Sequence, residues 1–277
     1  MPLRVGLVAG ESSGDLLGAG LITAVRERVP DAVFEGVAGP EMTAAGCERW
    51  ADSDELAVMG VVEPVKHLPR LLRLRRSLVS RWRESPPDVF VGIDAPDFNL
   101  GLEAALKASG IRTMHYVSPS IWAWRAGRIR KIRKAADCVM CILPFEPALY
   151  EEQGMNAVFV GHPKADVLSP DIDVPAVRRA LGLPEECRLV AMLPGSRGSE
   201  VTRLAPVFAA AAAIIAAREK DVHFVTPVAA PKLRPLIEES LRQHAVADRF
   251  TLVDGRSIES MSAADFVLLA SGTAALE

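Results

Sequence analysis

The chain lacks the features that would place it inside a membrane, in a secretory pathway or on nucleic acid. No stretch of its 277 residues approaches the ~20 uninterrupted apolar residues of a membrane-spanning helix. Residues 1–5 lead straight into a predicted strand, without the basic, apolar and cleavage regions of a signal peptide. The net charge of −3 gives no overall attraction for nucleic acid, so we predict no nucleic-acid partner. A cytoplasmic protein is expected, and binding at a membrane surface stays open.

Cysteines are also scarce, and only Cys138 and Cys141 have the spacing of a redox or metal pair. They lie in an apolar segment, 138–143, that is typical of a buried strand, whereas a redox pair favours a turn or a helix N-terminus. Two Asp-x-Asp pairs, at 52–54 and 171–173, match a motif of metal-dependent nucleotide-sugar enzymes, but neither follows a predicted strand. Two carboxylates alone make a poor Mg²⁺ site without substrate phosphates nearby. We predict neither a metal nor a cofactor.

Apolar residues make up 49% of the chain and charged residues 24%, which is enough apolar material for a buried core. The predicted strands cover residues 4–9, 33–37, 89–93, 113–117, 139–143, 157–160, 189–193, 223–228, 250–253 and 266–270. Helical spacing fills 16–29, 68–82, 100–108 and 204–217. Because several strands are apolar at every position and alternate with helices, the fold class is α/β with doubly wound parallel sheets.

The alternation breaks at residues 161–175, which contain three prolines and no apolar period. We predict an N-terminal Rossmann-like domain over 1–162, a linker over 163–175 and a second Rossmann-like domain over 176–277. Two such domains would leave a cleft between the carboxyl ends of their strands, where open α/β sheets bind ligands.

The turn after the first strand is rich in glycine and small polar residues. Its candidate ligand contacts are Gly10, Glu11, Ser12, Ser13 and Gly14. The turn does not spell G-x-G-x-x-G, and no acidic residue closes a second strand ~20 residues on, so a dinucleotide fingerprint is excluded. A cap on the following helix by Ser13 or Asp15 would explain the same residues.

Asp94 comes immediately after the apolar segment 89–93. A carboxylate at this end of a parallel strand lies at the ligand-binding edge of the sheet, where it can act as a general base. Asp97, which precedes Phe98, is typical of a capping residue. A turn or cap would also explain Asp94.

Aromatic residues make up only 5% of the chain, yet segment 115–125 gathers several of them beside Arg125. Its ring-bearing side chains are those of His115, Tyr116, Trp122 and Trp124. Such a loop suits a sugar or acyl ligand, and packing between the domains is the alternative.

Two basic segments, 66–83 and 125–134, stand out against the acidic mean. In the first, cations alternate with leucines at helical spacing, and Pro69 suits the start of that helix. A basic amphipathic helix is typical of an element that lies on an anionic membrane surface. A surface helix docked on its own sheet is the alternative.

Two turns in the second half are suited to present backbone N–H groups and a helix N-terminus to a phosphate. Residues 193–200 follow a predicted strand and add the cation Arg197, and Ser271, Gly272 and Thr273 follow another strand. Two such turns indicate a bound nucleoside diphosphate. Because the second turn ends the chain with no helix completed, we expect the chain to hold most, but not all, of a longer protein.

Seven segments together resemble the lipid-A-disaccharide synthase family, bacterial glycosyltransferases of the GT-B fold. They are LVAGESSGD (7–15), GVAGP (36–40), ELAVMG (55–60), VGIDAPDFN (91–99), HYVSPSIWAWR (115–125), LPGSRG (193–198) and LASGTAALE (269–277). They run in order from one end of the chain to the other, which is far more specific than any single motif.

The resemblance implies a GT-B fold whose second domain is incomplete. It implies an inverting transfer of 2,3-diacylglucosamine from its UDP derivative to 2,3-diacylglucosamine 1-phosphate, which releases UDP. Asp94 matches the family's proposed base, and Glu277 matches the position that holds the ribose hydroxyls. Other substrate contacts are expected from the 10–14 turn, Trp122, Arg197 and the 271–273 turn.

Because both substrates are acylated, the resemblance implies a peripheral protein on the anionic, cytoplasmic face of the inner membrane. A homodimer is left open. Three alternative functions stay open as well. Another UDP-sugar GT-B enzyme would lack the IDAPDFN segment, a nicotinamide oxidoreductase would need the missing fingerprint, and an inactive lipid-binding fragment would form no product.

Overall fold

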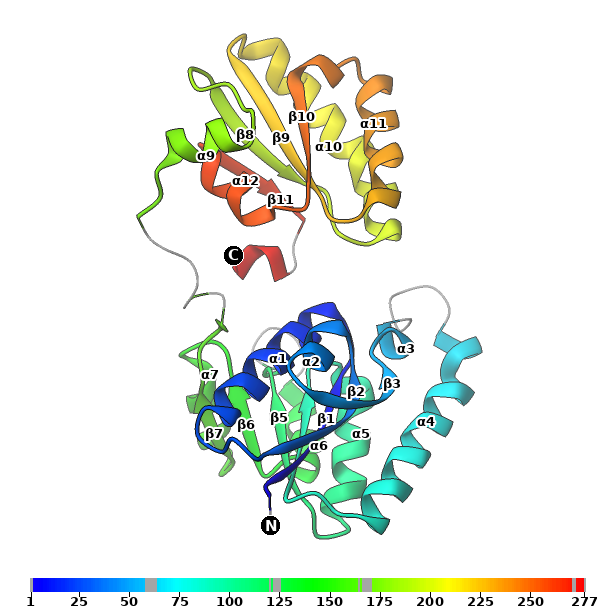
Figure 1. Ribbon diagram of the computed structural model, residues 1–277. Helices are drawn as coiled ribbons and strands as arrows, with labels where there is room; N and C mark the ends of the chain where they lie inside the picture. Colours follow the sequence, from blue (N-terminus) through cyan, green and yellow to red (C-terminus); the bar gives the residue numbers. More distant parts are fainter. Residues whose placement is uncertain are drawn as a thin grey trace. The chain divides into compact units, whose positions relative to one another are not determined.

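Parallel strands form the framework of both halves of the chain (Figure 1). The computed structural model describes residues 2–57, 64–119, 121, 126–163, 165, 171–270 and 273–276. The chain divides into two units, Met1–Asp166 and Val167–Glu277. The division lies within the predicted linker, 163–175, whose last two residues already belong to the helix α9 (Val174–Ala180).

The N-terminal unit is built on a sheet with the strand order β3-β2-β1-β4-β5-β6-β7, and all neighbouring pairs are parallel. The strands are β1 (Arg4–Ala9), β2 (Val33–Ala38), β3 (Cys47–Asp52), β4 (Val89–Ile93), β5 (Arg112–Tyr116), β6 (Cys138–Cys141) and β7 (Asn156–Phe159). The helices are α1 (Ser12–Arg26), α2 (Pro40–Ala44), α3 (Asp54–Ala57), α4 (Pro64–Glu84), α5 (Pro96–Lys107), η1 (Ala126–Arg128), α6 (Ile129–Ala135) and α7 (Glu146–Glu151). The chain winds outward from β1 through β2 to β3 and then returns to β4 on the other side of β1.

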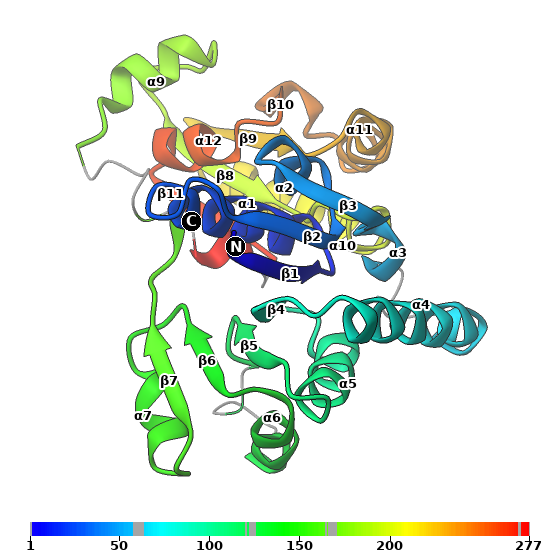
Figure 2. The same ribbon diagram turned by 60° about the horizontal axis from the view of Figure 1, so that its bottom comes forward.

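Alternate residues of the central strands enter two separate cores. Leu7 of β1 packs with Leu17 of α1 and Met42 of α2 on one face, and Val8 packs in the same cluster as Trp82 of α4 on the other. Figure 2 shows α4, α5 and α6 together on one side of the strands and α1 and α2 on the other. The central strands β1 and β4 are mostly apolar because both of their faces are buried.

The C-terminal unit repeats this design with the strand order β10-β9-β8-β11, again parallel throughout. Its strands are β8 (Arg188–Leu193), β9 (Val222–Val228), β10 (Phe250–Asp254) and β11 (Phe266–Leu269). Its further helices are α10 (Gly198–Arg218), η2 (Pro231–Leu233), α11 (Arg234–Gln243), η3 (Ala247–Arg249), α12 (Ser257–Ala263) and η4 (Thr273–Leu276). Buried residues of α10 and α11 share one core cluster, while Leu181 and Ala263 join another.

The ten predicted strands are confirmed, each within two residues at either end, but the sequence did not predict β3. This strand lies at the edge of its sheet, and Glu48 and Arg49 are exposed. Asp52 ends β3, so the expectation that neither Asp-x-Asp pair follows a strand is wrong. The Asp52 carboxylate pairs with Arg49 (2.9 Å) and accepts a hydrogen bond from the backbone N–H of Asp54 (3.0 Å), as in a turn.

All four predicted helices begin four to six residues earlier than predicted, α5 at Pro96 instead of residue 100 and α10 at Gly198 instead of residue 204. Helix α1 begins at Ser12 instead of residue 16, and α4 begins at Pro64, so that Pro69 lies inside the helix. Among the described residues, α10 is long and apolar enough to cross a membrane by length and composition. Its buried residues Val201, Ala205 and Ala209 recur every four positions and pack in the core of its own unit, which is the pattern of a helix docked on a sheet.

Candidate active site at the carboxyl ends of the strands

The topology of the N-terminal sheet brings two of the predicted site segments together. Strand β1 lies between β2 and β4, so the winding direction reverses between β1 and β4. Open α/β sheets bind ligands at such a switch point. The turns that follow the two strands touch, because a methyl group at Gly10 would overlap the Cβ atom of Ala95. The glycine-rich turn and Asp94 therefore share one edge of the sheet.

Asp94 is held by its backbone and leaves its carboxylate available. Its N–H donates a hydrogen bond to the carbonyl oxygen of Tyr116 (2.8 Å), and its carbonyl accepts one from the Asn99 amide (2.8 Å). Asp94 and Ala95 both have left-handed backbones, with φ of 50° and 42°. Within the described part of the chain, the half-buried Asp94 carboxylate forms no hydrogen bond or ion pair. Such a carboxylate can accept a proton from a ligand.

The glycine-rich turn forms the N-terminus of α1, with Glu11 as its N-cap residue and residues 12–14 in the first turn. The Glu11 side chain forms no N-cap hydrogen bond, and the backbone N–H groups of a helix N-terminus suit an anionic or hydroxyl-bearing ligand. The alternative in which Ser13 or Asp15 is the N-cap residue of this helix is wrong, because both lie inside α1. The buried Asp15 carboxylate instead accepts hydrogen bonds from the N–H groups of Gly39 (2.8 Å), Glu41 (2.9 Å) and Met42 (3.1 Å) and so caps α2.

The aromatic segment contributes less to the site than the sequence predicted. His115 and Tyr116 belong to β5 and are buried, with exposed fractions of 0% and 5%. Their proposed role as ligand-facing rings is therefore wrong. Trp122, Trp124 and Arg125 lie outside the described residues.

The C-terminal unit has its own switch point, between β8 and β11. Leu269 pairs with Leu193, and the N–H of Ala270 donates to the carbonyl of Leu193 (3.0 Å). The two predicted phosphate turns therefore start side by side. Thr273 begins η4, while Ser271, Gly272 and Glu277 lie outside the described residues.

Arg197 is the N-cap residue of the 21-residue helix α10. Its guanidinium pairs with Glu200 Oε1 at 3.2 Å, and its side chain is 55% exposed. The other oxygen of Glu200 accepts hydrogen bonds from the N–H groups of Ser196 (3.2 Å) and Arg197 (3.3 Å). The Glu200 carboxylate thus occupies the helix N-terminus at which a phosphate is expected.

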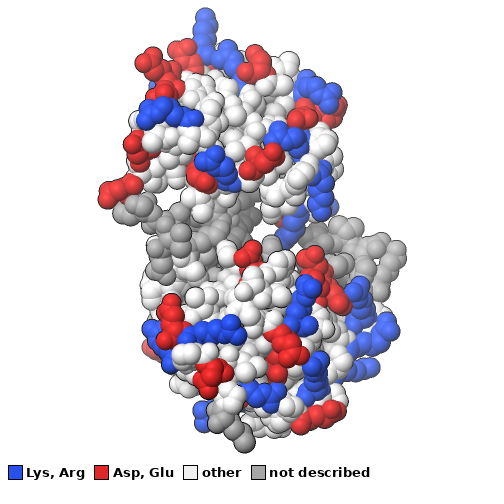
Figure 3. Space-filling model, in the orientation of Figure 1, with Lys and Arg blue, Asp and Glu red and all other residues white. Residues whose placement is uncertain are grey.

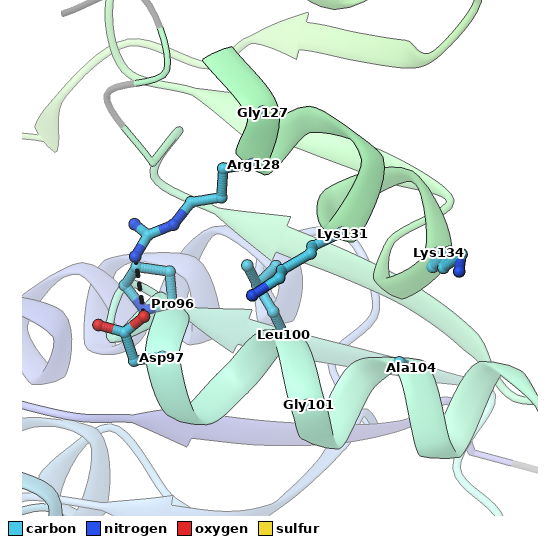
Figure 4. A pocket seen from close by; sticks show the side chains of 9 residues that line it. All are labelled: Pro96, Asp97, Leu100, Gly101, Ala104, Gly127, Arg128, Lys131 and Lys134. Atoms are coloured by element: carbon cyan, nitrogen blue, oxygen red, sulfur yellow. Dashed lines mark hydrogen bonds and ion pairs between the residues drawn. The ribbon is translucent and has the colours of Figure 1, made fainter. Parts of the chain in front are cut away.

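A cationic groove runs between α5 and α6 (Figure 4). It encloses about 590 Å³, and small or apolar residues of α5, among them Leu100, Gly101 and Ala104, line one side of it. Arg128, Lys131 and Lys134 line the other side, and Arg128 pairs with Asp97 at 2.8 Å. Asp97 therefore anchors an arginine at the start of α5.

The cysteines have the character of core residues. Burial raises the pKa of the Cys141 thiol to about 12 and raises that of Cys138 as well. Both belong to β6. Because the thiolate is the reactive form of cysteine, these raised pKa values make both thiols unreactive at neutral pH. The structural interpretation of this pair is supported.

The sequence of nearly the whole chain, residues 5–277, matches the family model "Lipid-A-disaccharide synthetase". The chain belongs to the lipid-A-disaccharide synthetase family. It is 52% identical over 277 residues to the lipid-A-disaccharide synthase of Alkalilimnicola ehrlichii and spans 72% of that protein. The Serratia proteamaculans enzyme is 51% identical, again with 72% spanned. The Xanthomonas campestris enzyme is 50% identical, with 63% spanned.

Solved structures similar to this family member confirm the GT-B fold. The UDP-GlcNAc 2-epimerase of Neisseria meningitidis, bound to UDP-GlcNAc, superposes with a TM-score of 0.63 over 98% of this chain and 78% of its own. A UGT transferase from Siraitia grosvenorii, in complex with UDP, gives a TM-score of 0.56 over 99% and 79%. Both are 12% identical to the chain, so they support the fold alone. Together with family membership, the fold confirms the predicted hexosyltransferase of lipid A biosynthesis.

Proposed function

We propose that the chain transfers 2,3-diacylglucosamine from its UDP derivative to the 6-hydroxyl group of 2,3-diacylglucosamine 1-phosphate. The observation that carries this proposal is the meeting of Asp94 with the glycine-rich turn at the switch point of the N-terminal sheet. Asp94 takes the proton of the acceptor hydroxyl, whose oxygen forms a bond to the anomeric carbon while the bond to UDP breaks. Attack from the side opposite UDP inverts the anomeric centre.

The departing UDP gains negative charge as that bond breaks, and its phosphates need donors and cations. The adjoining turns after β8 and β11 supply backbone N–H groups, the N-terminus of α10 and Arg197. We assign UDP to this switch point and the acceptor to the N-terminal unit. The chemistry of these residues needs no metal.

Both substrates carry acyl chains, so we also propose that the protein works at the anionic, cytoplasmic surface of the inner membrane. Helices α4, α5, η1 and α6 hold 13 of the 32 Lys and Arg residues but only three of the 35 Asp and Glu residues. In Figure 3, many of these cations gather where Figure 1 shows α4. The groove between α5 and α6 offers three of them to lipid phosphates.

The test of the transfer reaction uses the purified chain with both acylated substrates in detergent micelles and detects the tetraacyl disaccharide 1-phosphate by mass spectrometry. The variant Asp94→Asn should lose about 10²–10⁴-fold in kcat, which is the usual contribution of a general base, and should still bind UDP. Asp97→Asn, which removes a carboxylate three residues away, is the matched control. Turnover by Asp94→Asn within a few-fold of the parent would place the base elsewhere.

A further inference from the structure

A buried polar cluster lies directly beneath the Asp94 turn. Asn99 and Glu103 are one helical turn apart on α5, His115 lies on β5, and all three have exposed fractions of 0%. His115 Nδ1 is 2.6 Å from Glu103 Oε1. Gly92, which pairs in register with His115, leaves the space for this contact, because a methyl group there would overlap Glu103 and crowd Asn99.

Asn99 connects this cluster to the turn. Its amide nitrogen lies 2.8 Å from the carbonyl oxygen of Asp94, 3.2 Å from that of Ile93 and 3.3 Å from that of Val8. Because three carbonyl oxygens surround this atom, only the NH₂ end of the amide fits there. One side chain therefore ties the carboxyl end of β1 to the carboxyl end of β4.

These hydrogen bonds of Asn99 act on a backbone conformation that non-glycine residues rarely adopt. Asp94 and Ala95 are consecutive non-glycine residues with left-handed φ angles, which persist only when their surroundings impose them. The Asn99 donor lies against the carbonyl of Asp94 itself. The buried Glu103–His115 pair joins α5 to β5 and so fixes the turn of helix from which Asn99 projects.

We propose that Asn99 is the positioning residue for the catalytic base: its amide holds the left-handed Asp94–Ala95 turn and thereby aims the Asp94 carboxylate. The inference rests on the proposed role of Asp94. It assigns Asn99 no contact with substrate, so its loss should lower kcat and leave the KM for the UDP-sugar nearly unchanged. A misplaced base costs on the order of 10²-fold in rate, and we expect a loss of that size in Asn99→Leu.

The variant Asn99→Asp gives a signature that a merely structural residue would not. An ionised aspartate has the size of asparagine but offers only acceptors to three carbonyl oxygens, whereas a protonated aspartate can donate once. The kcat of this variant, relative to that of the parent, should therefore rise as the pH is lowered. Thr113→Val, which removes a buried hydrogen bond to the carbonyl of Ala135 near the start of β5, is the structural control and should change kcat less than threefold.

The decisive experiment is a double-variant cycle on kcat, with folding monitored by circular dichroism. If Asn99 acts through Asp94, then Asn99→Leu should lower kcat about 10²-fold in the parent and less than threefold in Asp94→Asn. Equal losses in both backgrounds, or a kcat within threefold of the parent, would overturn the inference. If Asn99→Leu does not fold, the same cycle with Asn99→Asp tests whether Asn99 acts through Asp94. Retention of activity by Asp94→Asn would instead overturn the proposed base.

Discussion

Arg197 begins α10 with its guanidinium 3.2 Å from the Glu200 carboxylate. Arg197→Ala should weaken UDP binding by roughly 1.5–3 kcal/mol, because a charge-assisted contact to phosphate is lost. Calorimetric titration with UDP measures the change. Glu200→Gln is the matched control. It keeps the side chain's shape and removes the competing charge, so it should not weaken binding. If Arg197→Ala binds UDP as tightly as the parent does, Arg197 does not contact the phosphates.

Trp82 shows how strongly a single residue can hold a helix on its sheet. Its ring is fully buried and lies 4.9 Å from that of Phe90 and 5.1 Å from that of Trp50, between centroids. Trp82→Ala should cost about 3–5 kcal/mol of unfolding free energy, as other buried aromatic residues do. Urea unfolding followed by circular dichroism measures the loss. Trp50→Ala removes a partly exposed ring and should cost clearly less, and equal costs would contradict the packing described.

At the scale of the element, α4 docks on its own sheet, which is one of the two alternatives that the sequence left open. Its apolar residues Leu71, Leu78 and Trp82 are buried in its own unit, so they are not available to a membrane. Leu68 is 51% exposed, and Arg73 and Arg76 are exposed as well. Membrane binding by α4 should therefore be mainly electrostatic.

Replacing Arg73 and Arg76 of α4, or Lys131 and Lys134 of α6, with serine should weaken binding to vesicles of anionic phospholipid. The expected loss is about 1 kcal/mol for each cation that reaches the surface. Added salt should mimic the change. Replacing Arg188 and Arg242, two exposed cations of the C-terminal unit, controls for net charge. If co-sedimentation with the vesicles changes neither in the two double variants nor with added salt, these cations of α4 and α6 do not bind the membrane.

The elements themselves were largely predictable from the sequence, since a strand buried on both faces is apolar at every position, as in residues 89–93. Strand β3 was not, because its exposed Glu48 and Arg49 resemble a loop. Asp94 could be predicted as a candidate general base because it directly follows a strand. Asn99, Glu103 and His115 could not be grouped, because only the register of β4 and β5 and the packing of α5 bring them together. Asp15 was misassigned for the same reason, since the N–H groups that it binds lie 24 to 27 residues away.

For the whole molecule, we expect limited proteolysis to cut first within 163–175, a segment rich in proline and aspartate that contains the division between the two units. The N-terminal unit buries two cores around a seven-stranded sheet and should survive as a resistant fragment. Mass spectrometry of the fragments locates the cut. A first cut inside the N-terminal sheet would contradict this order of stability.

The central place of β1 also affects how the protein is made. Residues 4–9 leave the ribosome before the other strands of this sheet, and β1 can pair with β2 soon afterwards. Its other edge pairs with β4, which begins only at Val89. Throughout the synthesis of the intervening segment, a strand that will lie in the middle of the sheet has an open, apolar edge. Such edges recruit other chains, so we expect aggregation of the nascent N-terminal unit to be most favoured before β4 has been made.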